Sequence, residues 1–274
     1  MSTEHPRIQL NDATVMPQLG LGVWQASDSE ATAAVREAIA AGYLAIDTAA
    51  IYKNEAGVGE GVRQAGKPRD QVFVTTKVWN DDQGYDAAIR ALEKSLQRLK
   101  MDYVDLLLIH WAQPSKNLYL ETWQALIELK KRGLTRSIGV SNFHEPHLQR
   151  IIDETGETPA VNQIELHPYL QQRPLREVHK RLGIHTEAWS PLAQGKAMGD
   201  PVLKQIAAKH GKEVAQVIIR WHLDSGLLVI PKSVTPARIR SNAEVFDFTL
   251  DADDMTAIAQ LDRGQRLGPD PDTF

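Results

Sequence analysis

Short apolar segments recur at regular intervals along this chain, and polar residues stand where most of them end. The eight segments are residues 19–24 (LGLGVW), 43–48 (YLAIDT), 72–78 (VFVTTKV), 103–110 (YVDLLLIH), 137–141 (SIGVS), 160–166 (AVNQIEL), 184–190 (IHTEAWS) and 227–232 (LLVIPK). Between them lie stretches with helical spacing of apolar side chains, such as residues 31–41, 87–99, 120–131, 146–153 and 201–210. This alternation predicts parallel strands, because parallel neighbours need a long crossover, usually a helix.

Eight strand and helix units in 274 residues predict one (β/α)8 TIM barrel, for which about 250 residues is typical. Residues 7–10 and 14–16 flank the turn signal Asn11-Asp12, which predicts an N-terminal β-hairpin closing the base of the barrel. Residues 252–261 predict an extra C-terminal helix. The Gly, Pro and Asp-rich residues 263–274 predict a C-terminal loop, either disordered or folded over the barrel mouth. We therefore expect a single domain over residues 1–274.

The composition excludes several classes of protein. With 42% apolar residues and a net charge of -4, the chain is typical of a soluble globular protein and not of a nucleic-acid binder. No apolar stretch approaches the roughly 20 residues that span a bilayer, and no signal peptide is evident, so we expect a cytoplasmic protein. It contains no cysteine, which excludes thiol catalysis and cysteine-bound metals.

Two further expectations concern metals and assembly. His144 and His147 form an i,i+3 pair, but no carboxylate partner is evident in the sequence, so we expect no metal site. No sustained exposed apolar stripe is apparent, and a monomer is expected.

Four residues near the ends of successive predicted strands suggest general acid chemistry. Asp47, Lys77 and His110 lie at strand ends, and Tyr52 follows Asp47 closely; in a TIM barrel these ends carry the active site. A tyrosine has a reference pKa of about 10, and an ammonium within about 4–6 Å lowers it. We expect Lys77, kept charged by Asp47, to lower the pKa of Tyr52, the proton donor, while His110 orients a substrate oxygen.

These four groups supply a proton but no electrons, so redox chemistry would need a cofactor. Trp189 ends a strand and could stack on a planar ring. Ser141, Asn142 and Gln163 end neighbouring strands with hydroxyl and amide groups that suit a carboxamide. Together these residues match the contacts that a nicotinamide requires.

A group of cations follows the last predicted strand. Residues 230–242 (IPKSVTPARIRSN) place Lys232, Ser233 and Arg238 where such barrels often bind phosphate. Two cations and a hydroxyl suit a phosphomonoester, such as the 2′-phosphate of NADPH.

Long motifs spread over the whole chain resemble those of the aldo-keto reductases. They are LGLGVWQ (19–25), DTAAIYKNE (47–55), TTKVWND (75–81), LLLIHW (106–111), SIGVSNF (137–143), NQIELHP (162–168), WSPLAQG (189–195) and IPKSVTPARI (230–239). Within the family the chain is most similar to bacterial 2,5-diketo-D-gluconate reductases, including RLGPDPD at 266–272.

The resemblance implies an enzyme that uses NADPH to reduce small ketones and aldehydes, such as 2,5-diketo-D-gluconate, methylglyoxal and 2-keto esters, to alcohols. It implies hydride transfer with Tyr52 as proton donor, Lys77 and Asp47 as its activators and His110 orienting the carbonyl. The implied cofactor-binding residues are Ser141, Asn142, Gln163, Trp189, Ser190, Leu192, Lys232, Ser233, Val234, Thr235, Arg238 and Asn242. The substrate pocket is expected to be lined by Trp24, Ile51, Trp79, His110 and Trp111.

Two residues depart from the family pattern. Ala112 stands where the family commonly has Pro after His-Trp, which predicts a different or less rigid loop and a changed substrate preference. Ser241 stands where a Glu usually precedes the final Asn, which predicts altered nucleotide affinity with phosphate recognition kept.

Other interpretations remain open from the residues alone. Asp47 and Lys77 are also compatible with a structural ion pair, and the tryptophans with a seal over the barrel. Lys77 could instead form a Schiff base in a lyase. A third possibility is a non-catalytic relative of these reductases, serving as a cofactor-sensing subunit of a channel.

Overall fold

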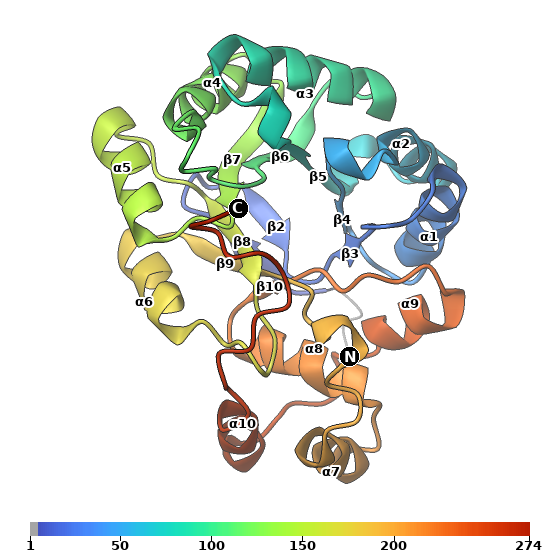
Figure 1. Ribbon diagram of the computed structural model, residues 1–274. Helices are drawn as coiled ribbons and strands as arrows, with labels where there is room; N and C mark the ends of the chain where they lie inside the picture. Colours follow the sequence, from blue (N-terminus) through green and yellow to red (C-terminus); the bar gives the residue numbers. More distant parts are fainter. Residues whose placement is uncertain (1–4) are drawn as a thin grey trace.

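Eight parallel strands form the centre of the computed structural model, which describes residues 5–274 (Figure 1). The strands follow one another around the sheet in chain order, from β3 to β10. Parallel bridges from Leu19 to Val229 and from Gly22 to Lys232 join the first strand to the last, which closes the barrel. The strands are β3 (Leu21–Gly22), β4 (Ala45–Asp47), β5 (Phe73–Val78), β6 (Val104–Ile109), β7 (Thr135–Ser141), β8 (Val161–Glu165), β9 (His185–Trp189) and β10 (Leu228–Val229).

All eight predicted strands are present, but the two that close the barrel are shorter than predicted. β3 and β10 have two residues each, although the apolar segments are 19–24 and 227–232. The two apolar segments remain hydrogen-bonded to each other beyond these short strands. The Gly20 amide donates to the Val229 carbonyl oxygen over 2.9 Å, and the Gly22 amide donates to the Pro231 carbonyl oxygen over 3.2 Å. Pro231 has no amide hydrogen to donate in return, so the regular ladder ends there.

Helices surround the ring of strands on its outside (Figure 1). The first is α1 (Asp28–Ala40), whose N-terminus is capped by Ser27 in a capping box with Glu30. The stretches predicted as helices from residues 31, 87, 120, 146, 201 and 252 are all helical, with ends shifted by a few residues. The remaining helices are α2 (Glu55–Gln64), α3 (Tyr85–Leu99), α4 (Tyr119–Lys131), α5 (Glu145–Thr155), α6 (Arg173–Leu182), α7 (Pro201–His210), α8 (Val214–Asp224), α9 (Pro236–Ala243) and α10 (Ala252–Ala259).

Helix α2 contains three glycines, which permit close contact with its neighbours. A Cβ atom on Gly57 would lie 2.2 Å from the Asp28 carbonyl oxygen, and one on Gly59 would lie 2.0 Å from the Leu99 carbonyl oxygen. Glycine normally weakens a helix interior by roughly 1 kcal/mol relative to alanine. The cost is offset here because α1 and the end of α3 approach more closely than any side chain would allow.

The predicted hairpin forms at the base of the barrel. Its strands β1 (Arg7–Gln9) and β2 (Val15–Pro17) pair antiparallel. The turn residue Asn11 donates side-chain hydrogen bonds to the carbonyl oxygens of Pro159 and Gly183, over 3.0 and 3.1 Å. These carbonyls precede β8 and β9, so the hairpin is tied to the amino ends of the strands, opposite the expected active site.

The segment after α10 is ordered and folds over the barrel mouth. In Figure 1 it runs across the ring of strands and places the C-terminus near the centre of the ring. Of the two conformations predicted for residues 263–274, the folded one is therefore observed. None of the helices within residues 5–274 has the length and apolar character needed to cross a membrane.

Candidate active site

An ion pair between Asp47 on β4 and Lys77 on β5 lies at the centre of the site. Lys77 Nζ is 2.6 Å from Asp47 Oδ1 and donates a second hydrogen bond to the Thr48 carbonyl oxygen over 2.9 Å. Burial is the largest single influence and would lower the pKa of Lys77. The contact with Asp47, together with the weaker effects of Tyr52 and Glu187, outweighs burial, so the pKa is raised. Lys77 is therefore a fixed positive charge at neutral pH.

Tyr52 lies beside this charge, on the short 3-10 helix Ala50–Tyr52 that follows β4. Lys77 Nζ is 5.1 Å from the centre of the Tyr52 ring. Burial raises the pKa of Tyr52 above its usual value, although Lys77 opposes this shift. The predicted lowering of the Tyr52 pKa is thus wrong in direction, because desolvation of the phenolate exceeds the attraction of the ammonium. At neutral pH Tyr52 keeps its proton, which is the form a donor needs.

His110 follows β6 and faces Tyr52 across the site. Its ring centre lies 5.7 Å from that of Tyr52 and 5.1 Å from that of Trp79, both in edge-on arrangements. Burial and the nearby Lys77 charge hold the pKa of His110 well below its usual value. The imidazole is therefore neutral at physiological pH and has one N–H group to donate.

These groups open into a cavity of about 550 Å³ at the carboxyl ends of the strands. Trp24, Ile51, Trp79 and Trp111, the expected substrate-binding residues, line it together with Tyr52, Asp47 and His110. The C-terminal residue Phe274 also lines the cavity, with its ring centre 4.6 Å from that of Trp111. This end of the cavity is consequently aromatic and apolar.

The residues expected to bind a carboxamide line the same cavity and form one chain of hydrogen bonds. Trp189 Nε1 donates to Asn142 Oδ1 over 2.8 Å, and Asn142 Nδ2 donates to Ser141 Oγ over 3.0 Å. Ser141 Oγ in turn donates to the Gln163 carbonyl oxygen over 2.8 Å. Ser190, which follows Trp189 in the left-handed region with φ of 49°, turns the chain out of β9. The indole of Trp189 is thereby held in one orientation at the cavity wall.

The expected phosphate-binding residues lie beside and beyond this cavity. Lys232 lines the cavity and is exposed, and Arg238 is exposed in the first turns of α9. Within the described part of the chain, neither cation belongs to an ion pair. The other expected cofactor residues outside the cavity lining are Leu192, Ser233, Val234, Thr235 and Asn242. Both cations are thus available to an anion at the end of the barrel where α9 begins.

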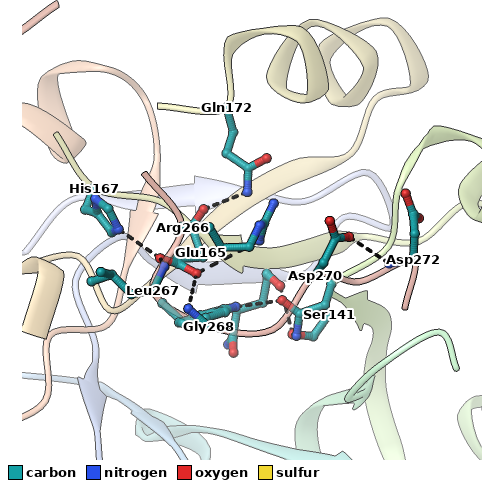
Figure 2. A network of polar contacts seen from close by, with 12 residues as sticks. Ser141, Glu165, His167, Gln172, Arg266, Leu267, Gly268, Asp270 and Asp272 are labelled. Carbon is teal, nitrogen blue, oxygen red and sulfur yellow. Dashed lines mark hydrogen bonds and ion pairs between the residues drawn. The ribbon is translucent and has the colours of Figure 1, made fainter. Parts of the chain in front are cut away.

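A second network of polar contacts holds the C-terminal segment over the cavity (Figure 2). The fully buried Glu165 side chain accepts hydrogen bonds from the amides of Leu267, over 2.6 Å, and Gly268, over 2.9 Å. It also contacts His167 Nε2 at 2.9 Å, and Arg266 lies 3.9 Å away. Burial alone would raise the pKa of Glu165, but the bonds from His167, Gly268 and Leu267 leave it lowered. The carboxylate therefore stays charged and anchors the segment.

The anchored segment contributes residues to the site that the sequence did not predict. Leu267, Gly268, Pro269 and Phe274 line the cavity. A Cβ atom on Gly268 would lie 2.5 Å from Trp189 Cη2, so only glycine fits between the indole and the backbone at this point. The segment is recognisable in the sequence only as a loop, and its contacts bridge more than a hundred residues. Gly22, Gln25, Gln194 and Ile230 also line the cavity without having been predicted.

The same segment corrects the expectation that His144 lacks a carboxylate partner. His144 Nδ1 lies 2.8 Å from Asp272 Oδ1, across 128 residues of sequence. His144, Asp270 and Asp272 also bring three potential ligand atoms within 4.8 Å of one another, in a largely exposed cluster. His147 stacks on His144, with ring centres 6.2 Å apart.

Comparisons with known proteins agree over nearly the full chain. Residues 17–263 match the Aldo/keto reductase family. The chain is 58% identical to methylglyoxal reductase DkgA of Yersinia pestis, over 99% of this chain and 98% of that protein, and 56% identical to DkgA of Escherichia coli K12, over 97% of each. The structure of a Gox0644 mutant in complex with NADPH superposes with a TM-score of 0.95 at 52% identity, covering 98% of both chains. This protein is therefore a member of the aldo/keto reductase family.

Proposed function

We propose that this protein reduces small ketones and aldehydes with NADPH, with Tyr52 as the proton donor. The observation that carries the proposal is that Tyr52 and His110 line one cavity with the residues expected to bind the carboxamide, while the Lys77 ammonium lies behind Tyr52, 5.1 Å from its ring centre. Gox0644 was crystallised with NADPH, and the DkgA relatives carry the name methylglyoxal reductase.

The residues present fit NADPH. Gln163 and Ser141 line the cavity with polar groups, and Trp189 offers the edge and face of a fixed indole. Neither Lys232 nor Arg238 forms an ion pair among residues 5–274, although the Glu30 carboxylate is close enough to Lys232 to interact with it electrostatically, so both cations can still contact a phosphate. Ser241 stands where the family pattern has a glutamate, so that carboxylate is missing. Glu213 Oε2 lies 3.5 Å from Ser241 Oγ. A carboxylate thus remains available near the nucleotide end.

The division of roles follows from the electrostatics of the site. Bound NADPH supplies a hydride to the carbonyl carbon. Tyr52 holds its proton at neutral pH and gives it to the carbonyl oxygen, where negative charge develops. Lys77 then stabilises the phenolate that remains, from 5.1 Å away. His110, which is neutral, donates a hydrogen bond to the same oxygen and orients it.

The chemistry of the cavity suits a compact, weakly polar carbonyl. Trp24, Trp79, Trp111 and Phe274 enclose the end near Tyr52. Methylglyoxal and 2-keto esters need no counter-ion there, whereas 2,5-diketo-D-gluconate carries a carboxylate, and Lys232, the exposed cation of the lining, is assigned to the phosphate of NADPH. All three are candidate substrates, and we place the protein in the cytoplasm as a monomer.

A Schiff-base lyase is disfavoured by the state of Lys77. A nucleophilic lysine needs an uncharged amine, but the contact with Asp47 raises the pKa of Lys77. No observation favours this chemistry over reduction.

The test is NADPH oxidation followed at 340 nm with methylglyoxal, a 2-keto ester and 2,5-diketo-D-gluconate, with NADH in parallel. Tyr52→Phe keeps the ring and removes the proton, so turnover is expected to fall by about 100-fold or more while NADPH still binds. Tyr85→Phe, on the exposed side of α3, is the matched control. Near-normal turnover in Tyr52→Phe would refute the mechanism, and absence of both NADPH binding and turnover in the unaltered protein would refute the function.

A further inference from the structure

Glu187 is a fully buried carboxyl group that the proposed mechanism does not use. It lies on β9, paired in register with Gln163 on β8. Its Oε2 accepts a hydrogen bond from Gln163 Nε2 over 2.7 Å, while its Oε1 has no hydrogen-bond partner among the described residues. A buried carboxyl group with so few partners is costly, so its presence beside the site calls for an explanation.

Gln163 is held by two carboxyl groups at once. Its Nε2 donates to Asp47 Oδ2 over 2.8 Å as well as to Glu187 Oε2. An amide has two N–H donors and one carbonyl oxygen, so both donors are consumed. If the amide were flipped, its oxygen would face the charged Asp47 carboxylate, which repels it, and Glu187 Oε2 would lose its N–H donor. The side chain therefore has one favourable orientation, with Oε1 left over on a residue that lines the cavity.

The orientation of Gln163 decides which ligand group it can recognise. A carbonyl oxygen accepts from an N–H donor, so it suits the NH2 end of a primary carboxamide. An amide free to flip would accept or donate equally well and would not distinguish that group from a ketone or a carboxylate. Burial and the neighbouring Asp47 raise the pKa of Glu187 to about 8, so at neutral pH Glu187 is protonated and adds little negative charge next to Asp47.

We propose that Glu187 is a positioning residue: with Asp47 it fixes the Gln163 amide so that its carbonyl oxygen faces the cavity and selects the carboxamide of the nicotinamide ring. The inference rests on the proposed use of NADPH. It assigns to Glu187 a part in cofactor discrimination that acts through Gln163, without contact between Glu187 and the cofactor.

The experiment compares dissociation constants for NADP⁺ and its 3-acetylpyridine analogue, which lacks the amide N–H donor, by quenching of tryptophan fluorescence. The unaltered protein is expected to bind NADP⁺ about fivefold to tenfold more tightly, the equivalent of one hydrogen bond. Glu187→Met, of similar length but without an acceptor oxygen, should reduce this ratio to about one. Glu187→Gln retains an acceptor for Gln163 and should restore the ratio.

Binding of 2′,5′-ADP, which has no nicotinamide, is the control for folding and should be the same in all variants. If Glu187→Met does not fold, Glu187→Thr is the second variant, because threonine suits a strand and is too short to reach Gln163. An unchanged ratio in either variant, or equal binding of both ligands by the unaltered protein, overturns the inference. Failure of the unaltered protein to bind NADP⁺ at all would instead refute the proposed function.

Discussion

Replacing Glu165 with glutamine is expected to release the C-terminal segment from the cavity mouth. The carboxylate accepts two backbone hydrogen bonds, from Leu267 and Gly268. A hydrogen bond to a charged group contributes about 1.5–3 kcal/mol, and one between neutral groups about 0.5–1.5 kcal/mol. Glutamine keeps one acceptor oxygen and no charge, so the segment loses roughly 2–4 kcal/mol of anchoring.

Amide hydrogen exchange at Leu267 and Gly268 measures this loss directly, because local opening sets their exchange rates. A loss of about 2–4 kcal/mol corresponds to exchange that is faster by about one and a half to three orders of magnitude. Amides of β6, such as that of Leu107, should not change. Glu154→Gln, an exposed pair with Arg150 on α5, is the matched control and should leave both amides protected. Unchanged exchange at 267 and 268 in Glu165→Gln would refute the anchoring role.

Two further predictions concern charge. Lys232→Ala combined with Arg238→Ala should weaken NADPH by about 100-fold, at about 1.5 kcal/mol or more per charged contact, and NADH far less; titrations showing equal losses for both nucleotides would refute the phosphate assignment. The pKa of Glu187 is raised to about 8 in the folded protein. The unfolded chain loses this proton at lower pH, so the free energy of unfolding decreases as the pH rises from about 4.5 towards 8. Glu187→Gln removes that penalty. The free energy of unfolding of the variant minus that of the unaltered protein, measured with urea at pH 5.5 and 8, should therefore increase with pH by up to about 1.4 kcal/mol per pH unit. A difference that does not change with pH would contradict the raised pKa.

The convergence of the proposed catalytic residues was predictable, because the strands whose ends carry most of them are parallel. In parallel strands the carboxyl ends meet at one rim, so Asp47, Lys77, His110 and Trp189 had to converge once the strands were recognised. The regular spacing of the apolar segments predicted these parallel strands. The sign of the Tyr52 pKa shift was not predictable, since it depends on how completely the cavity walls exclude water.

The contacts that were not predicted join segments that lie far apart in the sequence. The bond from Leu267 to Glu165 spans 102 residues, and that between His144 and Asp272 spans 128. No local pattern marks such pairs. Helix α2 was not singled out for a related reason: its glycines contradict helical propensity and make sense only when the carbonyl groups of Asp28 and Leu99 are seen against them.

The seating of Phe274 against Trp111 has a practical consequence for handling the protein. An affinity tag or fluorescent protein fused after Phe274 would begin at the lining of the cavity, on the segment whose Leu267 and Gly268 amides bind Glu165. A tag placed before the β1–β2 hairpin would extend from the opposite end of the barrel, beside the amino ends of the strands. A tag after Phe274 is therefore expected to change the substrate preference that is measured.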